Sequence, residues 1–202
     1  MPNNITNTRA WFPEDAVIKL ENKTTGSRET ITTRVTNYSE GGGDKDTESI
    51  AHFGGAYLVI KKPQSDYEVS FDVSVKDTGW AEIVSGDVVS SNAFRMVRSG
   101  GNQNPHKIKV QWDDPQSQES YKIVYYNAYG ISVETDNAAD DRLTATVNFK
   151  ISPTDANGSP QRLEMETGSR NSAGIGSTIT GSYGSWEAFY DSLHGFGVGS
   201  LL

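Results

Sequence analysis

The side chains best suited to catalysis are three histidines and two pairs of adjacent aspartates. His52, His106 and His194 lie far apart, and their spacing matches neither HxH nor HExxH, the patterns that bind metal ions. Catalysis by proton transfer needs a base held beside its partner, so we expect a structural role for each histidine. The aspartate pairs at 113–114 and 140–141 would suit a glycosidase. Neighbouring carboxylates in turns are more simply loop residues, and we expect the protein not to be an enzyme.

Other motifs for ligand chemistry are incomplete. Residues 44–48 and 155–158 resemble calcium loops, but neither has the ligand register that ends in a bidentate glutamate. The three glycines at 41–43 do not stand between a strand and a helix, as a phosphate loop requires. The chain has no cysteine, which excludes a thiol nucleophile and thiolate metal sites. We predict no metal site and no cofactor.

The charge balance argues against nucleic acid as a specific ligand. Lysine and arginine number 18 against 26 aspartates and glutamates, so the formal net charge is -8 at pH 7. Phosphate backbones are bound by clustered basic side chains that release counterions, and this chain would on average repel them. The longest apolar run, residues 56–60, is far shorter than the roughly 20 residues of a membrane-spanning helix. We therefore expect no membrane association.

Strands with alternating side chains dominate the chain and must position any site. Residues 66–76 place Tyr67 and every second residue after it on an apolar face, and the alternation recurs from 142 to 151. Both segments predict long strands with one buried face. The polar face of the first carries Glu68, Ser70, Asp72 and Ser74. Shorter strands, rich in Val, Ile, Thr and aromatic residues, are predicted at 17–22, 30–38, 57–61, 94–98, 108–112, 121–127, 131–134 and 162–166.

Two segments have helical spacing. Residues 79–85 place Trp80, Ile83 and Val84 on one face, and a second apolar stripe begins after Ser185 and ends before Gly195. The stripe consists of Trp186, Phe189, Tyr190 and Leu193. The strands are not separated by the helices that parallel crossovers require. The predicted fold is therefore mainly β: an antiparallel β-sandwich or partly closed barrel with one short packed helix and a C-terminal helical arm.

The predicted organisation has three parts. Residues 1–167 form the β-sandwich domain, from which the polar, glycine-rich residues 40–50 leave as an exposed loop. Residues 168–182 are mostly Gly, Ser or Thr, which is the composition of a linker. Residues 183–202 form the C-terminal arm, which either contacts a neighbouring molecule or completes the core of its own chain.

Aromatic side chains leave a carbohydrate-binding module as an alternative, because aromatic platforms on β-sandwiches stack on sugar rings. Trp80 and Trp112 lie on the apolar faces of their elements and are expected in the core. The surface candidates are Trp11 and Trp186, with tyrosines 121, 125, 126 and 129.

Residues 66–87 and 141–159 resemble the tail tube proteins of long-tailed, siphovirus-type bacteriophages, a family related in fold to the tube proteins of contractile tails and of type VI secretion. The first stretch is a long alternating strand that runs into a short helix, and the second is a long strand that ends in a polar turn. The resemblance implies a self-assembling subunit that forms stacked hexameric rings around a channel for the genome. It also implies a place in the virion tail after synthesis in the host cytoplasm. Other tail proteins would be partners at the tube ends, and DNA would pass through without specific binding.

This resemblance makes three groups of residues candidates for assembly. The polar strand face would line the channel through Glu68, Ser70, Asp72 and Ser74. The loop at 40–50 would reach a neighbouring subunit through Glu40, Asp44, Asp46 and Glu48. The arm would make its contacts through Trp186, Phe189, Tyr190 and Leu193. Arg142 and Lys150 on the second long strand either face away from the channel or make it mixed in charge. Another ring-forming tail protein, such as a tube terminator, is the alternative function within this resemblance.

Overall fold

The computed structural model of the chain describes residues 16–31, 35–51, 57–76, 79–85, 88–90, 93–94, 104–113, 120–137, 142–167 and 186–196. The strands are β1 (Ala16–Asn22), β2 (Arg28–Thr30), β3 (Val35–Gly42), β4 (Thr47–Ala51), β5 (Tyr57–Lys61), β6 (Tyr67–Ser74), β7 (Val88–Ser90), β8 (Ala93–Phe94), β9 (His106–Asp113), β10 (Ser120–Asp136), β11 (Thr144–Ile151) and β12 (Arg162–Thr167). The helices are α1 (Gly79–Ser85) and α3 (Trp186–His194), at the positions that the sequence predicts. Neither described helix is long and apolar enough to cross a membrane.

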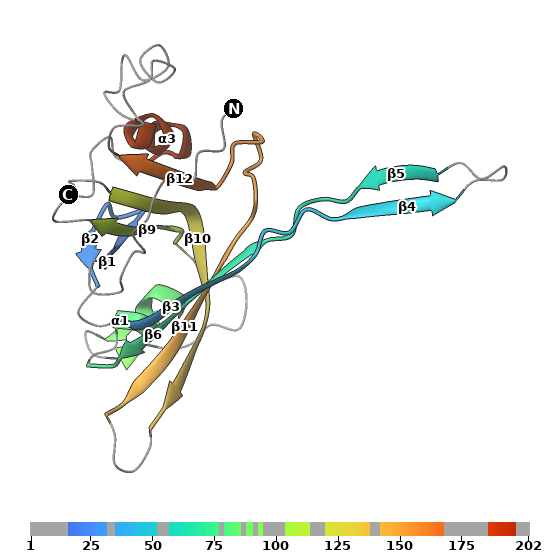
Figure 1. Ribbon diagram of the computed structural model, residues 1–202. Coiled ribbons are helices and arrows are strands. Elements are labelled where there is room, and N and C mark those ends of the chain that lie inside the picture. The colour runs from blue at the N-terminus through green and yellow to red at the C-terminus, as the bar shows by residue number, and fades with distance from the viewer. Residues whose placement is uncertain are drawn as a thin grey trace.

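One curled antiparallel sheet forms the body, in the order β2-β1-β9-β10-β11-β6-β3, with β12 paired to β10 (Figure 1). Residues 120–125 of β10 pair with both β9 and β12, whereas residues 129–136 pair with β11. We call β2, β1, β9, β12 and the start of β10 the first half-sheet, and the end of β10 with β11, β6 and β3 the second half-sheet. Their inner faces enclose one core as an open half-barrel, which confirms the predicted mainly antiparallel β fold.

The core follows from the alternation in the sequence. On β6, Val69, Phe71 and Val73 point inward and are buried, and their register partners on β11 are apolar as well. The first half-sheet contributes the buried Ile108 and Tyr125 from β9 and β10. Each such side chain contributes about 1.5–3 kcal/mol on burial. Trp80 is buried in this core and Trp112 packs against it, as expected.

β10 joins the half-sheets because it bends at Asn127. This residue has a φ of 50°, in the left-handed region that asparagine tolerates better than most residues. Its side chain accepts a hydrogen bond from Lys23 Nζ at 3.0 Å and donates one to Gln161 Oε1 at 2.6 Å. The register with β9 shifts at the same place. The sequence predicts two strands here, at 121–127 and 131–134; the structure has one bent strand.

Two contacts tie the half-sheets together across the open side of the core. The hydroxyl groups of Tyr38 on β3 and Tyr125 on β10 lie 2.7 Å apart. Arg162 on β12 donates from Nε and Nη2 to the two carboxylate oxygens of Glu40 on β3, at 2.7 and 3.3 Å. Burial raises the pKa of Tyr38 to about 12, so the phenol stays protonated at neutral pH. The half-barrel is thus closed by side chains where the sheet itself stays open.

A long two-stranded ribbon leaves the body and ends in β4 and β5 (Figure 1). Residues 40–50, expected as a loop, belong mainly to β3 and β4 and are corrected to a ribbon strand. Gly42 and Gly43 have φ values of 73° and 74°, and a Cβ on Gly43 would lie 2.1 Å from the Tyr67 ring. At Gly42 a Cβ would lie 2.0 Å from the Asp66 backbone oxygen, so only glycine fits at these two positions. Gly42 and Gly43 therefore allow the turn with which the ribbon leaves the sheet.

Candidate assembly surfaces

The outer face of the second half-sheet, which we call the polar face, is built from aligned rows of polar residues. Register places Ser39, Ser70, Asn148 and Ser132 in one row across β3, β6, β11 and β10. Ser39 Oγ and Ser70 Oγ lie 2.7 Å apart, and Asn148 Nδ2 donates to Ser132 Oγ at 2.9 Å. These side chains hydrogen-bond to one another, so the row is a surface of neutral dipoles.

The next row places an acid at its centre. Asp72 accepts hydrogen bonds from Thr146 Oγ1 at 2.7 Å and from Asn37 Nδ2 at 3.1 Å. Glu134 continues the row on β10, opposite Thr146. The predicted channel-lining set of Glu68, Ser70, Asp72 and Ser74 thus lies on one face together with residues of three other strands. That this face lines a channel stays a prediction.

Lys150 lies on the same polar face, because β11 pairs directly with β6 and Lys150 is opposite Glu68. Its ammonium group is 3.3 Å from Asp66 Oδ2, and the two side chains are 47% and 39% exposed. Exposed pairs of this kind contribute about 0–1 kcal/mol. The face is therefore mixed in charge at this edge, and a channel that it lined would be mixed in charge as well. Glu68, Asp72, Glu134 and Asp136 keep acidic residues in the majority.

A hollow of about 250 Å³ lies on the polar face. Its lining includes Ser39 and Gly41 of β3, Glu68 and Ser70 of β6, and Ile131 and Asn148 of the neighbouring strands. Its serines bond to each other rather than to a base, so the hollow has no activated nucleophile. Among the described residues there is also no group of three His, Cys, Asp or Glu side chains able to hold a metal ion.

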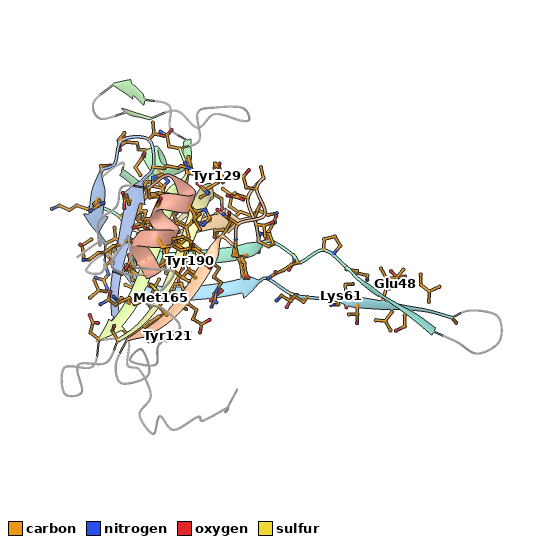
Figure 2. All side chains as sticks on the ribbon, turned by 90° about the horizontal axis from the view of Figure 1, so that it is seen from above. Glu48, Lys61, Tyr121, Tyr129, Met165 and Tyr190 are labelled. Carbon is orange, nitrogen blue, oxygen red and sulfur yellow. The ribbon has the colours of Figure 1, made fainter. Side chains whose placement is uncertain are left out.

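The β4–β5 ribbon exposes apolar side chains far from the body. Ile50, Val59 and Ile60 are 40%, 59% and 41% exposed. Ile60 lies opposite Glu48, two residues from Ile50, so the isoleucines share one ribbon face and Val59 lies on the other. Figure 2 shows Glu48 and Lys61 on this ribbon, well away from the half-sheets.

The predicted loop residues have different surroundings from one another. Glu40 lies in the body and forms an ion pair with Arg162 of its own chain; its contact with a neighbouring subunit stays a prediction. Asp46 forms an exposed ion pair with Lys62 at 3.1 Å and accepts a hydrogen bond from the Thr47 backbone. Asp44 bonds through its backbone to Ser65, at the base of the ribbon. Glu48 is exposed on β4. Contacts of the last three residues with a neighbouring molecule stay a prediction.

The outer face of the first half-sheet is covered by α3, through an ionic contact that the sequence analysis missed. Lys107 and Lys109 point outward from β9, yet both side chains are buried. Lys107 Nζ lies 2.6 Å from Asp191 Oδ1 and 3.2 Å from Glu187 Oε1, and Lys109 Nζ lies 3.3 Å from Glu187 Oε2. Tyr126 Oη donates to Asp191 Oδ1 at 3.1 Å. Two lysines and two carboxylates thus form one buried cluster, with Lys122 close enough to add a further positive charge.

The protonation of this cluster is set by burial and by the neighbouring charges. Burial opposes ionisation of Glu187, but the ammonium groups of Lys107 and Lys109 outweigh it and hold the pKa of Glu187 below its ordinary value. Burial raises the pKa of Asp191, which Lys107 offsets only in part. Burial also lowers the pKa of Lys109. Each effect has the sign expected for charges removed from water.

The face of α3 toward the sheet is the charged one, not the predicted apolar stripe. Glu187, Ala188, Asp191 and His194 are buried. Of the stripe, Tyr190 stacks on Tyr126 and lies on the side of α3 toward Met165 (Figure 2). Phe189 is half-buried, and Leu193 is 47% exposed. The side chain of Trp186 lies outside the described residues. The helix thus covers its own chain with its charged side, and contacts of the stripe with another molecule stay a prediction.

The carbohydrate platform is not assembled in the described part of the chain. Tyr125 and Tyr126 are fully buried, on opposite faces of β10, which corrects their assignment as surface candidates. Trp11 lies outside the described residues. Of the aspartate pairs, only Asp113 is described, exposed at the end of β9. His106 and His194 are buried, and His52 lies outside the described residues.

Comparison with known proteins finds similarity at the level of the fold. No protein-family model matches the sequence, and no curated protein matches it. The structure is similar to a chain of the anti-feeding prophage cap, described as its tube-terminating cap, with a TM-score of 0.50 and 11% identity over 83% of this chain and 100% of that chain. It is also similar to a chain of the anti-feeding prophage baseplate, with a TM-score of 0.53 and 8% identity over 80% of this chain and 97% of that chain. The chain shares the fold of these two chains of the anti-feeding prophage.

Proposed function

We propose that this protein is a structural subunit that forms rings, stacked into the tube of a phage-type tail that delivers a genome. The proposal rests most on the β4–β5 ribbon, which carries Ile50, Val59 and Ile60 into solvent away from the core. An isolated two-stranded ribbon is marginally stable in water, and exposed apolar side chains gain free energy when they are covered. A neighbouring copy of the chain is the cover that a homo-oligomeric ring supplies.

The half-barrel supports the same proposal. β3 ends the described sheet and pairs on one side only, with β6. A sheet edge of eight residues is a template for another strand. If the second half-sheets of several copies join at such edges, their polar faces continue into one ring, and the open edge is removed as in a closed barrel.

The chemistry of the polar face suits a channel for DNA. Its serines and Asn148 bond to each other, and Asp72 accepts hydrogen bonds from Thr146 and Asn37. Such a surface has no cluster of free donors for phosphates, and it would not displace the counterions of DNA as clustered basic side chains do. The net charge of -8 adds general repulsion. DNA would therefore pass without adhering.

A tube terminator is the second candidate, favoured by the similarity to the chain of the anti-feeding prophage cap. A terminator and a tube subunit share a ring-forming surface, but a terminator ring does not continue to stack. The length of the assembled particles distinguishes them: tubes of increasing length for a tube subunit, and single rings at every concentration for a terminator.

The ribbon can be tested by replacing Ile50, Val59 and Ile60 with threonine, which keeps β propensity and removes apolar surface. We expect normal unfolding of the monomer and loss of assembly by light scattering. Leu143→Thr is the control, since Leu143 is 40% exposed, as Ile50 is, but lies off the ribbon. Undiminished assembly of the triple variant would show that the ribbon does not join copies.

A further inference from the structure

The outer face of the first half-sheet carries two buried ammonium groups, which need carboxylates as partners. We call this surface the lysine face: Lys107 and Lys109 on β9, with Val124 and Tyr126 on β10. Two ammonium groups excluded from water are costly unless carboxylates lie against them. α3 supplies Glu187 and Asp191 at a spacing of four residues, one helical turn, and each reaches Lys107. The lysine face thus recognises an acidic helix of this pattern.

α3 docks through specific ion pairs, but two of its buried polar atoms lack hydrogen-bond partners. Asp191 Oδ2 and His194 Nε2 are buried and have no hydrogen-bond partner. The apolar part of the contact is small, with Tyr126, Val124 and Phe196 at its centre. Buried ion pairs gain little net free energy over desolvation, although breaking one is costly. The contact is therefore suited to selecting a matching helix more than to holding it irreversibly.

The connection to α3 is much longer than is needed for α3 to contact the lysine face of its own chain. β12 borders the lysine face, since Leu163 and Met165 pack against its apolar residues. Most connections between adjacent elements have about 4–6 residues. Eighteen residues, 168 through 185, separate the end of β12 from the start of α3. Fully extended, a chain of this length spans roughly 60 Å, enough to reach the same surface on an adjacent molecule.

We propose that α3 of one copy docks on the lysine face of a second copy, with the contacts that it makes within its own chain. The proposal rests on the proposed function in that the partner is another copy of this chain. Exchange of an identical element costs little, because every ion pair is remade and only the path of the connection changes. Within a ring or stack, the high local concentration of lysine faces favours exchange between copies.

Two variants with reversed charge test this exchange. In the acceptor variant, Lys107→Glu and Lys109→Glu oppose the carboxylates of its own α3. In the helix variant, Glu187→Lys and Asp191→Lys oppose its own lysines. Each should lose docking of its own helix by at least about a hundredfold, because like charges face each other in a buried site. Mixed, the acceptor variant still offers a native α3, and the helix variant still offers a native lysine face.

The readout is amide hydrogen exchange of residues 186–194, with one copy labelled by ¹⁵N so that the two helices are measured separately. We expect fast exchange in each variant alone. Protection should return in the α3 of the acceptor variant when the helix variant is added in excess. Fast exchange that persists in the mixture overturns the proposal, and it would leave the imaging of rings and tubes unaffected as the test of the proposed function.

Two controls keep the result interpretable. Circular dichroism checks that both bodies fold; if Lys107→Glu/Lys109→Glu does not, Lys107→Met/Lys109→Met removes the charges while keeping side-chain length. Reversal of the exposed pair Lys62 and Asp46 should leave α3 protection unchanged in every copy, since this pair lies on the ribbon. Exchange is supported when α3 of the acceptor variant becomes protected only after the helix variant, with its native lysine face, is added. Assembly through other surfaces would not bury α3 again.

Discussion

Lys107 on β9 and Asp191 on α3 form an ion pair of 2.6 Å in which both side chains are fully excluded from solvent. The two residues are 84 positions apart in the chain. The pair fixes where α3 lies on the sheet, since a helix shifted by one turn would leave a carboxylate and an ammonium group buried without partners. Charge thus sets the register of this contact more than apolar packing does.

Replacement of Lys107 by Met should destabilise the protein by about 3–5 kcal/mol, because it leaves Asp191 and Glu187 buried beside each other with one lysine fewer. Urea unfolding measures the loss, with amide exchange of α3 to detect undocking before global unfolding. Lys62→Met is the matched control: its pair with Asp46 is exposed, so the change should cost at most about 1 kcal/mol. Equal costs for the two variants would contradict a buried role for Lys107.

Gly130→Ala should destabilise the core by about 1–3 kcal/mol, the usual cost of overpacking. A Cβ on Gly130 would lie 3.0 Å from Val84 Cγ2 and 3.2 Å from Val84 Cα, so α1 and β10 would have to separate. Gly41→Ala serves for comparison, because a Cβ there meets no atom within 4 Å. Thermal unfolding of both variants gives the result; a neutral Gly130→Ala would mean that α1 does not pack closely on β10.

Stability should fall as the pH drops below the ordinary histidine pKa of about 6.5. Burial lowers the pKa of both His106 and His194; for His194, Asp155 opposes the shift and Lys23 adds to it. Below this pH the unfolded chain binds protons more readily than the folded chain does. The contribution of the two neutral histidines to the free energy of unfolding is therefore complete above about pH 6.5 and is lost as the pH falls toward their lowered pKa values. The pKa of Glu187 is held below its ordinary value by Lys107 and Lys109, so this carboxylate stays ionised over the histidine range.

Urea midpoints measured between about pH 7.5 and about pH 5.5 test this dependence. His194→Gln should flatten the curve, because it removes one of the two titrating rings while leaving a polar group beside Gln161. An unchanged midpoint across this range would mean that neither histidine has the environment described for it.

The alternation of the sequence predicted the second half-sheet well, because burial on one face imposes a period of two. Val69, Phe71 and Val73 are inside and Glu68, Ser70 and Asp72 are outside, as expected. The two helices were also predicted, from spacing and, for α3, from the closing Gly195. These elements depend mainly on local pattern, so the sequence was sufficient.

The lysine face was not predicted because lysines that alternate with apolar residues in a strand are normally assigned to its solvent-exposed face. Lys107 and Lys109 follow this pattern, and only the distant α3 makes them buried. The complementary signal, Glu187 and Asp191 one turn apart, was hidden by the aromatic stripe. One strand of the ribbon was predicted, at 57–61, but its partner was not. Polar and glycine-rich residues indicate a loop, whereas pairing between 43–46 and 62–66 continues β3 into β4.

Negative-stain electron microscopy of the purified full-length protein, over a range of concentration and salt, tests the central claim most directly. We predict hollow rings that stack into tubes, with the polar face toward the bore. Single particles of monomer size under every condition, including after addition of preformed tail ends as an initiator, would contradict an assembling tail subunit.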